Sequence, residues 1–135
     1  MIGLVVVTHG ALAETLLATA ELIIGPQPGA VALSLSRGEA PELLRGRLTR
    51  AIAEAGSGCE AVLLMTDMFG GTPSNIGMTL VEPGRVDLLT GVNLPMLLKF
   101  FNYRNNHDLV ELTPLLREQA REAIIAASEL LPRQG

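Results

Sequence analysis

Four short apolar segments, spread along the chain, limit the folds open to this sequence more than any other feature. They cover residues 2–8, 30–35, 61–66 and 85–90, and most of them are nearly continuous in aliphatic side chains. A continuous apolar strand has to be covered on both faces, which is typical of parallel sheets in α/β proteins. Stretches with helical spacing separate the four segments. The sequence therefore predicts an α/β fold, a doubly wound and mostly parallel open sheet with helices on both faces.

Helix signals fall in the intervals between these strands. Proline just after a capping residue marks two expected starts, at Thr72-Pro73 and at Thr113-Pro114, because proline fits the first turn of a helix. The last amphipathic stretch is expected to stay helical through Leu131. The other helices are expected over residues 11–24, 41–55 and 94–102. The 135 residues contain no linker or internal repeat, so we expect a single domain over residues 1–135.

Composition and charge narrow the class of function. The chain has a net charge of −4, three Phe, one Tyr and no Trp, and its basic residues do not cluster. Nucleic-acid binding is therefore disfavoured. The first residues lack the basic region of a signal peptide, and no apolar run reaches the roughly 18 residues of a membrane span, so we expect a cytoplasmic protein. The single cysteine, Cys59, is expected to be a small buried hydrophobe.

Polar residues of chemical interest follow the expected strands. His9 and Gly10 come after the first strand, Asp67 after the third, and the second runs into Ser-Arg-Gly at residues 36–38. Open parallel sheets bind ligands beyond the carboxyl ends of their strands, where the strand order reverses. A carboxylate that accepts from the Nδ1–H of a histidine fixes its tautomer and leaves the Nε2 lone pair exposed. We therefore expect His9 and Asp67 to form a nucleophile and its orienting partner.

The stretch "FGGTPSN", which follows Asp67, predicts an anion site. Two adjacent glycines let backbone N–H groups converge, and a helix begins directly after them. Hydroxyl and amide side chains in the same stretch add donors, and the glycine after His9 leaves room for a ligand. The candidate anion-binding residues are Gly10, Gly70, Gly71, Thr72, Ser74 and Asn75.

Each of these features also has an ordinary structural explanation. A histidine after a strand is often simply exposed, an aspartate there is often a cap, and Gly-Gly-Thr-Pro alone is a turn and a helix start. The stretch matches neither the Walker phosphate loop nor the dinucleotide fingerprint. No metal is indicated, because His9, Asp67, Cys59 and His107 lack a recognisable ligand spacing, and His107 is expected to be solvated. The three features together, at strand ends, favour a functional site.

Three motifs also resemble a known family. "VVVTHGALAETLLATAELIIG", "LLMTDMFGGTPSNIG" and "LLTGVNLPMLLK" resemble the enzyme IIA domain of the mannose/fructose/sorbose class of the bacterial sugar phosphotransferase system. The similarity runs in register over about the whole chain. The most specific parts are T-H-G, D-x-x-G-G-[ST]-P-x-N and G-V-N-x-P, which occur in the family's order.

The resemblance implies a concrete role for the site. His9 matches the histidine that takes a phosphoryl group from the phosphocarrier protein HPr and passes it to a cysteine or histidine of a IIB component. Asp67 matches that histidine's hydrogen-bond partner. The anion site expected above, from Gly70 to Asn75, would then hold the phosphoryl oxygens. Family members are homodimers that exchange an antiparallel edge strand. Neither cofactor nor metal is implied, since the donor is another protein's phosphohistidine.

Two departures from the family pattern leave alternatives open. The positions of Thr72 and Ser74 often carry Ser and Phe in sugar-transporting relatives, and residue 135 ends the sequence without a fused IIB domain. Such a protein could serve membrane permease subunits in trans or a regulatory protein. The alternatives are the phosphotransfer subunit of dihydroxyacetone kinase and an interaction module that is never phosphorylated. A small hydrolase that uses His9 and Asp67 is disfavoured, because the sequence has no serine or cysteine nucleophile at a strand-to-helix turn.

Overall fold

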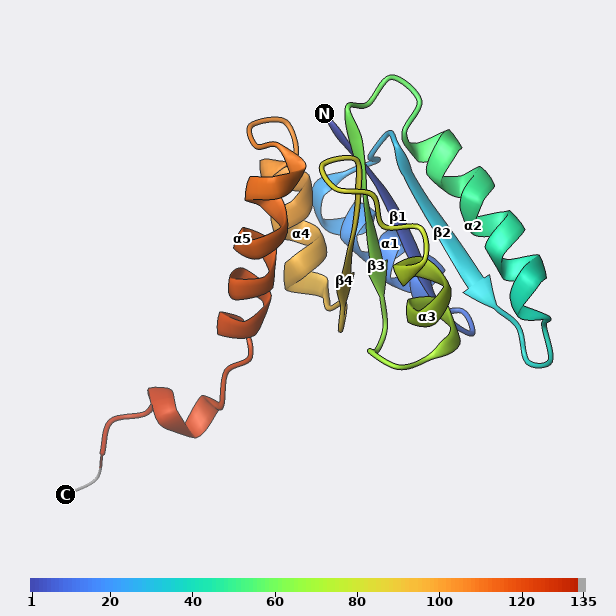
Figure 1. Cartoon of the computed structure of the whole chain (residues 1–135). Helices are drawn as coiled ribbons and strands as arrows, with labels where there is room; N and C mark the ends of the chain where they lie inside the picture. The colour runs from blue at the N-terminus through green and yellow to red at the C-terminus, as the bar shows by residue number, and fades with distance from the viewer. Residues whose placement is uncertain (134–135) are drawn as a thin grey trace.

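The sheet at the centre of the protein is parallel throughout. The structure is a computed structural model that describes residues 1–133. Its four strands lie in the order β2-β1-β3-β4, and each neighbouring pair is parallel (Figure 1). The strands are β1 (Ile2–His9), β2 (Ala30–Leu35), β3 (Ala61–Thr66) and β4 (Val86–Thr90).

Helices cover both faces of this sheet, as predicted (Figure 1). They are α1 (Leu12–Ile24), α2 (Pro41–Ala55), α3 (Thr72–Met78), α4 (Leu94–Tyr103) and α5 (Leu109–Glu122), followed by a 3-10 turn at Ala127–Leu130. Helices α1, α4 and α5 pack on one face, and α2 and α3 pack on the other. The doubly wound α/β fold is thereby confirmed. Among residues 1–133, no helix is long and apolar enough to cross a membrane.

The central strand β1 explains why its sequence is apolar without alternation. Leu4 and Val6 belong to the core that includes α1, α4 and α5, whereas Val5 and Val7 belong to the core that includes α2 and α3. All four side chains are fully buried. Successive residues of a strand point to opposite faces, so a sheet that is covered twice requires apolar residues at every position.

The strand order reverses between β1 and β3. From β1 the chain crosses through α1 to β2 on one side, and from β3 it crosses through α3 to β4 on the other. Val7 lies opposite Thr66 in this pair, so the residues that follow β1 and β3 emerge side by side. The N–H of Gly10 donates to the carbonyl of Leu35 at 3.0 Å and ties this edge to the end of β2. The ligand site expected of such a fold is this crevice.

The last helix begins earlier than predicted. Asp108 caps α5, because its side chain accepts from the N–H of Glu111 at 2.8 Å and the Glu111 carboxylate accepts from the N–H of Asp108 at 3.3 Å. The prediction of a start at Thr113-Pro114 was wrong, since Pro114 lies inside the helix. Proline removes the hydrogen bond to the residue four positions earlier and crowds its carbonyl; here that residue is Val110, whose side chain is exposed.

The helix also ends earlier than Leu131, at Glu122. The segment that follows leads away from the body of the protein (Figure 1) and exposes four large aliphatic side chains. They are Ile124, Ile125, Leu130 and Leu131. The four strands found within residues 1–133 are all parallel to their neighbours in the sheet, so the exchanged antiparallel strand stays a prediction.

Candidate functional site

A histidine and a carboxylate meet in the crevice between β1 and β3. Nδ1 of His9 lies 2.8 Å from Oδ2 of Asp67, and the backbone N–H of His9 donates to the same oxygen at 3.0 Å. An ionised carboxylate only accepts hydrogen bonds, so Nδ1 carries the proton and Nε2 keeps its lone pair. The His9 side chain is 47 % exposed, whereas that of Asp67 is 14 % exposed. The nucleophilic nitrogen is therefore held in a fixed orientation within reach of solvent.

The remaining oxygen of Asp67 is also bonded. Oδ1 accepts from the N–H of Met68 at 3.1 Å. The carboxylate thus joins the end of β1 to the start of the loop after β3, and its rotation would break three hydrogen bonds. Such a partner orients the ring and fixes its tautomer.

Gly71 lies against the imidazole ring on the side that faces the loop. A Cβ placed on Gly71 would come within 2.7 Å of Cε1 and 3.4 Å of Nε2 of His9. Contacts under 3.0 Å between such atoms do not occur, so a side chain here would displace the ring. The glycine pair therefore admits the histidine as well as shaping the turn.

Three buried hydroxyl side chains make hydrogen bonds that fix the backbone around the crevice. Thr8, Thr66 and Ser74 are all fully buried. Oγ1 of Thr8 accepts from the N–H of Ala13 at 2.8 Å and so satisfies an N–H at the start of α1. Oγ of Ser74 lies 2.6 Å from Oγ1 of Thr66 and donates to the carbonyl of Met68. The Ser74 hydroxyl is therefore engaged in holding the loop and does not face His9 as a donor.

Some of the predicted anion-binding residues lie around His9, and others, Gly70 and Asn75, do not line the depression beside it. Gly10 and Thr72 line one depression together with His9, and Gly71 packs on the ring. Gly70 sits at φ +86° with open space around it, which fits a turn residue. The side chain of Asn75 is exposed on α3, and the hydrogen bonds found for this residue use its backbone N–H, which donates to Gly71.

The depression around His9 has a volume of about 480 Å³. The turn after β2 forms its far wall, and with it comes a basic residue, Arg37, which the sequence analysis placed at a strand end but not in the site. Glu39 of the same turn is hydrogen-bonded by Arg47 at 2.9 and 3.0 Å, and this bond holds the pKa of Glu39 below its usual value. The lining residues are His9, Gly10, Leu35, Ser36, Arg37, Gly38, Glu39 and Thr72.

The other titratable candidates lie elsewhere. His107 is half-buried rather than solvated, with Nδ1 3.2 Å from the carbonyl of Tyr103 and its ring against the Tyr103 ring. The carbonyl of Arg104 accepts from the N–H of Ile2, so this loop lies at the amino ends of the strands, opposite His9. Among residues 1–133, no three His, Cys, Asp or Glu residues are arranged to hold a metal ion.

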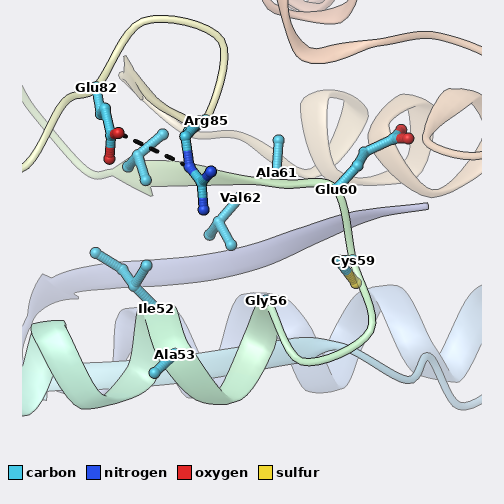
Figure 2. A pocket seen from close by; sticks show the side chains of 10 residues that line it. Ile52, Ala53, Gly56, Cys59, Glu60, Ala61, Val62, Glu82 and Arg85 are labelled. Carbon is cyan, nitrogen blue, oxygen red and sulfur yellow. Dashed lines mark ion pairs between the residues drawn. The ribbon is translucent and has the colours of Figure 1, made fainter.

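A second depression, of about 260 Å³, also lies at the amino ends of the strands (Figure 2). Cys59 is half-buried at its rim rather than buried in the core. Two charged residues on its wall, Glu82 and Arg85, pair with one another at 3.8 Å. This hollow offers neither an exposed nucleophile nor a converging set of donors, so the crevice at His9 is the functional candidate.

Fold and site together define a class: an α/β protein that presents an oriented nucleophilic histidine at the switch point of a parallel sheet. The family model described as "PTS system fructose IIA component" matches residues 3–114 of the chain. The PTS system fructose-specific EIIA component of Bacillus subtilis is 29 % identical over 134 residues, covering 98 % of this chain and 91 % of that protein.

Further relatives agree in sequence and structure. The PTS system mannose-specific EIIAB component of Escherichia coli K12 is 32 % identical over 127 residues, which are 93 % of this chain but only 39 % of that protein. A crystal structure of the phosphotransferase system component EIIA from Streptococcus agalactiae superposes with a TM-score of 0.86 at 27 % identity, covering 96 % of this chain and 99 % of that one. The chain belongs to the fructose/mannose IIA family of the sugar phosphotransferase system. It is a phosphoryl carrier and a phosphotransferase component.

Proposed function

We propose that Nε2 of His9 takes a phosphoryl group from the phosphohistidine of HPr and passes it to a IIB component. The observation that carries this proposal is the 2.8 Å contact between Nδ1 of His9 and Asp67, made by a histidine whose side chain is 47 % exposed. The nitrogen that keeps its lone pair is the one that a second protein can reach. The role places the protein in the cytoplasm, where the donor proteins act.

The transfer step needs no external acid or base. The lone pair of Nε2 forms a bond to phosphorus, and the P–N bond of the donor breaks, with its electron pair returning to the donor's ring. Because Nδ1 of His9 keeps the proton that it donates to Asp67, the phosphorylated ring is cationic. Asp67 stabilises that cation by a charge-assisted hydrogen bond. When the group moves on to the IIB component, the ring returns to its neutral form.

Backbone and hydroxyl donors around the depression are suited to the phosphoryl oxygens. Gly71 and Thr72 border the ring, and we propose that they form the cradle. The N–H of Gly10 already donates to the carbonyl of Leu35, so we propose that Gly10 leaves room for the phosphoryl group and is not a donor to it. Preorganised donors of this kind stabilise the charge that spreads over the transferred group. The Ser74 hydroxyl supports this loop from inside, so Ser74 contributes through the backbone. We propose Asn75 only as a donor at the rim.

We also propose that two copies of the chain form a homodimer through the β4 edge. Beside this edge lies a depression of about 410 Å³ whose apolar walls include Phe69, Met78 and Val81, all of them exposed. The segment after α5 exposes apolar residues and leads away from its own body (Figure 1). A second copy can supply that segment as an antiparallel edge strand, which would cover both surfaces at once.

Labelling from the physiological donor tests the proposal. The protein is incubated with phosphoenolpyruvate, enzyme I and HPr, and its intact mass is measured. We expect a gain of one phosphoryl group per chain, which is lost when a mannose-type IIB protein is added. The E. coli mannose EIIAB component serves as the positive control. Absence of any mass gain in the folded protein, with the control labelled, would show that this chain is an interaction module.

A further inference from the structure

Arg37 occupies a defined position across the depression from His9. It lies in the turn that follows β2, where the N–H of Glu39 donates to the carbonyl of Ser36 at 3.0 Å. Gly38, the third residue of the turn, has φ +80°, a conformation that glycine adopts without cost. Arg37 is therefore the corner residue of a tight turn, and its side chain lines the same hollow as His9.

The turn is anchored to the rest of the protein by Glu39 and Arg47. Glu39 Oε1 accepts from the N–H of Ser36 at 3.3 Å and from Arg47 at 3.0 Å, and Arg47 also donates to the carbonyl of Ser34 at 3.0 Å. The Glu39 side chain is only 8 % exposed. These bonds hold the turn at a fixed place relative to β2. The end of β2 is in turn bound to Gly10, because the carbonyl of Leu35 accepts from the N–H of Gly10.

Arg37 has no carboxylate partner, because the carboxylates of Glu39 and Asp67 are paired with other residues. The carboxylate of Glu39 is paired with Arg47 at 2.9 Å, and that of Asp67 with His9 at 2.8 Å. No carboxylate of the described residues lies within 4.0 Å of the Arg37 side chain nitrogens. The hollow is thus lined by one exposed arginine that forms no ion pair among the described residues, and His9, which would carry the phosphoryl group, lines the same hollow.

We propose that Arg37 binds the phosphoryl group carried on His9 and so holds it in place during transfer. This inference rests on the function proposed above. The planar guanidinium presents paired N–H donors that match two oxygens of a phosphoryl group. Its charge compensates the group in the loaded state and the charge that develops during transfer. Arg37 lines the same depression as His9, Gly10 and Thr72, so its side chain can reach a group bound there.

A small donor separates contact with the phosphoryl group from contact with a partner protein. Phosphoramidate offers no protein surface. Its nitrogen is protonated near neutral pH, so when Nε2 of His9 bonds to phosphorus, the P–N bond breaks and its electron pair leaves with ammonia. Arg37→Gln is compared with Arg50→Gln, which removes an exposed arginine on α2 that lines a different hollow. We expect the labelling rate of Arg37→Gln to be lower than that of wild type by a factor of about 10 or more. Arg37→Lys should recover part of the rate, and Arg50→Gln should keep the wild-type rate.

The loaded protein gives a second measurement. Phosphorus NMR follows the last ionisation of the phosphoryl group with pH, and loss of a neighbouring cation raises the pKa of that group. We expect a higher pKa in phosphorylated Arg37→Gln than in wild type and no change in Arg50→Gln. A change in folding alone would not produce this shift.

Each outcome decides the inference. Wild-type labelling of Arg37→Gln by phosphoramidate, with an unchanged phosphoryl pKa, overturns it. Normal labelling by phosphoramidate but slow labelling by phospho-HPr also overturns it, because Arg37 then acts on the donor protein. If the wild-type protein is labelled by neither donor, the proposed function itself fails, and the inference fails with it.

Discussion

At the scale of single residues, the site depends on one carboxylate oxygen that accepts two hydrogen bonds from the same residue. Oδ2 of Asp67 binds both the ring and the backbone N–H of His9. The ring contact orients the nucleophile, and the backbone contact fixes the strand end that carries it. In the proposed mechanism the negative charge has a separate task, because it stabilises the cationic ring that carries the phosphoryl group.

Replacing Asp67 with Asn separates these tasks. The amide oxygen can still accept from Nδ1 and from the N–H of His9, so the fold and the ring orientation should survive although the bond from the N–H of Met68 is lost. Loss of the charge should cost about 1.5–3 kcal/mol in the transfer step, or roughly 10- to 100-fold in rate. Rapid-quench labelling with phospho-HPr measures the rate, and circular dichroism checks the fold. An unchanged rate in the folded variant would remove Asp67 from the mechanism.

Gly71→Ala tests how closely the ring position is set. The new methyl group would lie 2.7 Å from Cε1 of His9, so the ring must move. A displacement of about 1 Å can cost on the order of 100-fold in rate. We expect at least a 10-fold drop in labelling from phospho-HPr and a shift of the His9 ring signals in NMR.

Gly70→Asn is the matched control for this variant. Gly70 has nothing within 4 Å of its Cβ position, and Asn tolerates its φ of +86° better than other residues. Its labelling rate should stay close to wild type. Equal losses in both variants would indicate that the loop is sensitive to any side chain, and that contact with the ring is not the reason.

At the scale of elements, the start of α5 depends on a capping box. Asp108 and Glu111 satisfy each other's backbone N–H groups. Asp108→Ala should lower the free energy of unfolding by about 0.5–2 kcal/mol, measured by urea denaturation. Thr113→Ala removes only a hydroxyl that donates to the carbonyl of Leu109 within the helix, and its effect should be smaller. The reverse order would restore Thr113 as the helix start.

The pairing of Glu39 with Arg47 makes the stability of the β2 turn depend on pH. The hydrogen bond from Arg47 lowers the pKa of Glu39 below its usual value. A lowered carboxyl pKa stabilises the folded state above the unfolded pKa, and this contribution is lost as pH falls through the lowered value. Glu39→Gln should therefore be less stable than wild type at neutral pH, and the gap should close in acid. Urea titrations of wild type and Glu39→Gln at neutral and at acid pH measure this difference in stability. A difference that persists in acid would contradict the pairing.

Elements buried on two faces were predictable from sequence, and elements placed by side-chain contacts were not. The strands could be found because both faces require apolar residues, and His9 and Asp67 because they follow neighbouring strands. The Asp108-x-x-Glu111 signal for α5 was present in the sequence, but the prediction used only Thr113-Pro114. The burial of the Ser74 hydroxyl depends on how the loop folds back on β3, which spacing does not reveal. The place of Arg37 in the hollow depends on the turn geometry in the same way.

At the scale of the whole molecule, the exposed apolar side chains beside β4 and after α5 are the basis for the proposed homodimer. We expect light scattering at micromolar concentration to give a mass near twice the 14.3 kDa of one chain. Ile124→Asp combined with Ile125→Asp should yield monomers, because charged residues cannot be buried against an apolar edge. Leu22→Asp, at an 85 % exposed position on α1, is the control that should stay dimeric. A wild-type mass of one chain would contradict the dimer.

Phosphorylation of His9 is the central claim, and it is tested most directly by comparing His9→Ala with His107→Ala. Both are labelled with phosphoenolpyruvate, enzyme I and HPr. We expect no label on His9→Ala and full labelling of His107→Ala, since His107 lies at the other end of the sheet against Tyr103. The label should be lost in acid and persist in base, as a phosphohistidine requires. Full labelling of folded His9→Ala, or an acid-stable phosphate on Thr72 or Ser74, would contradict the account.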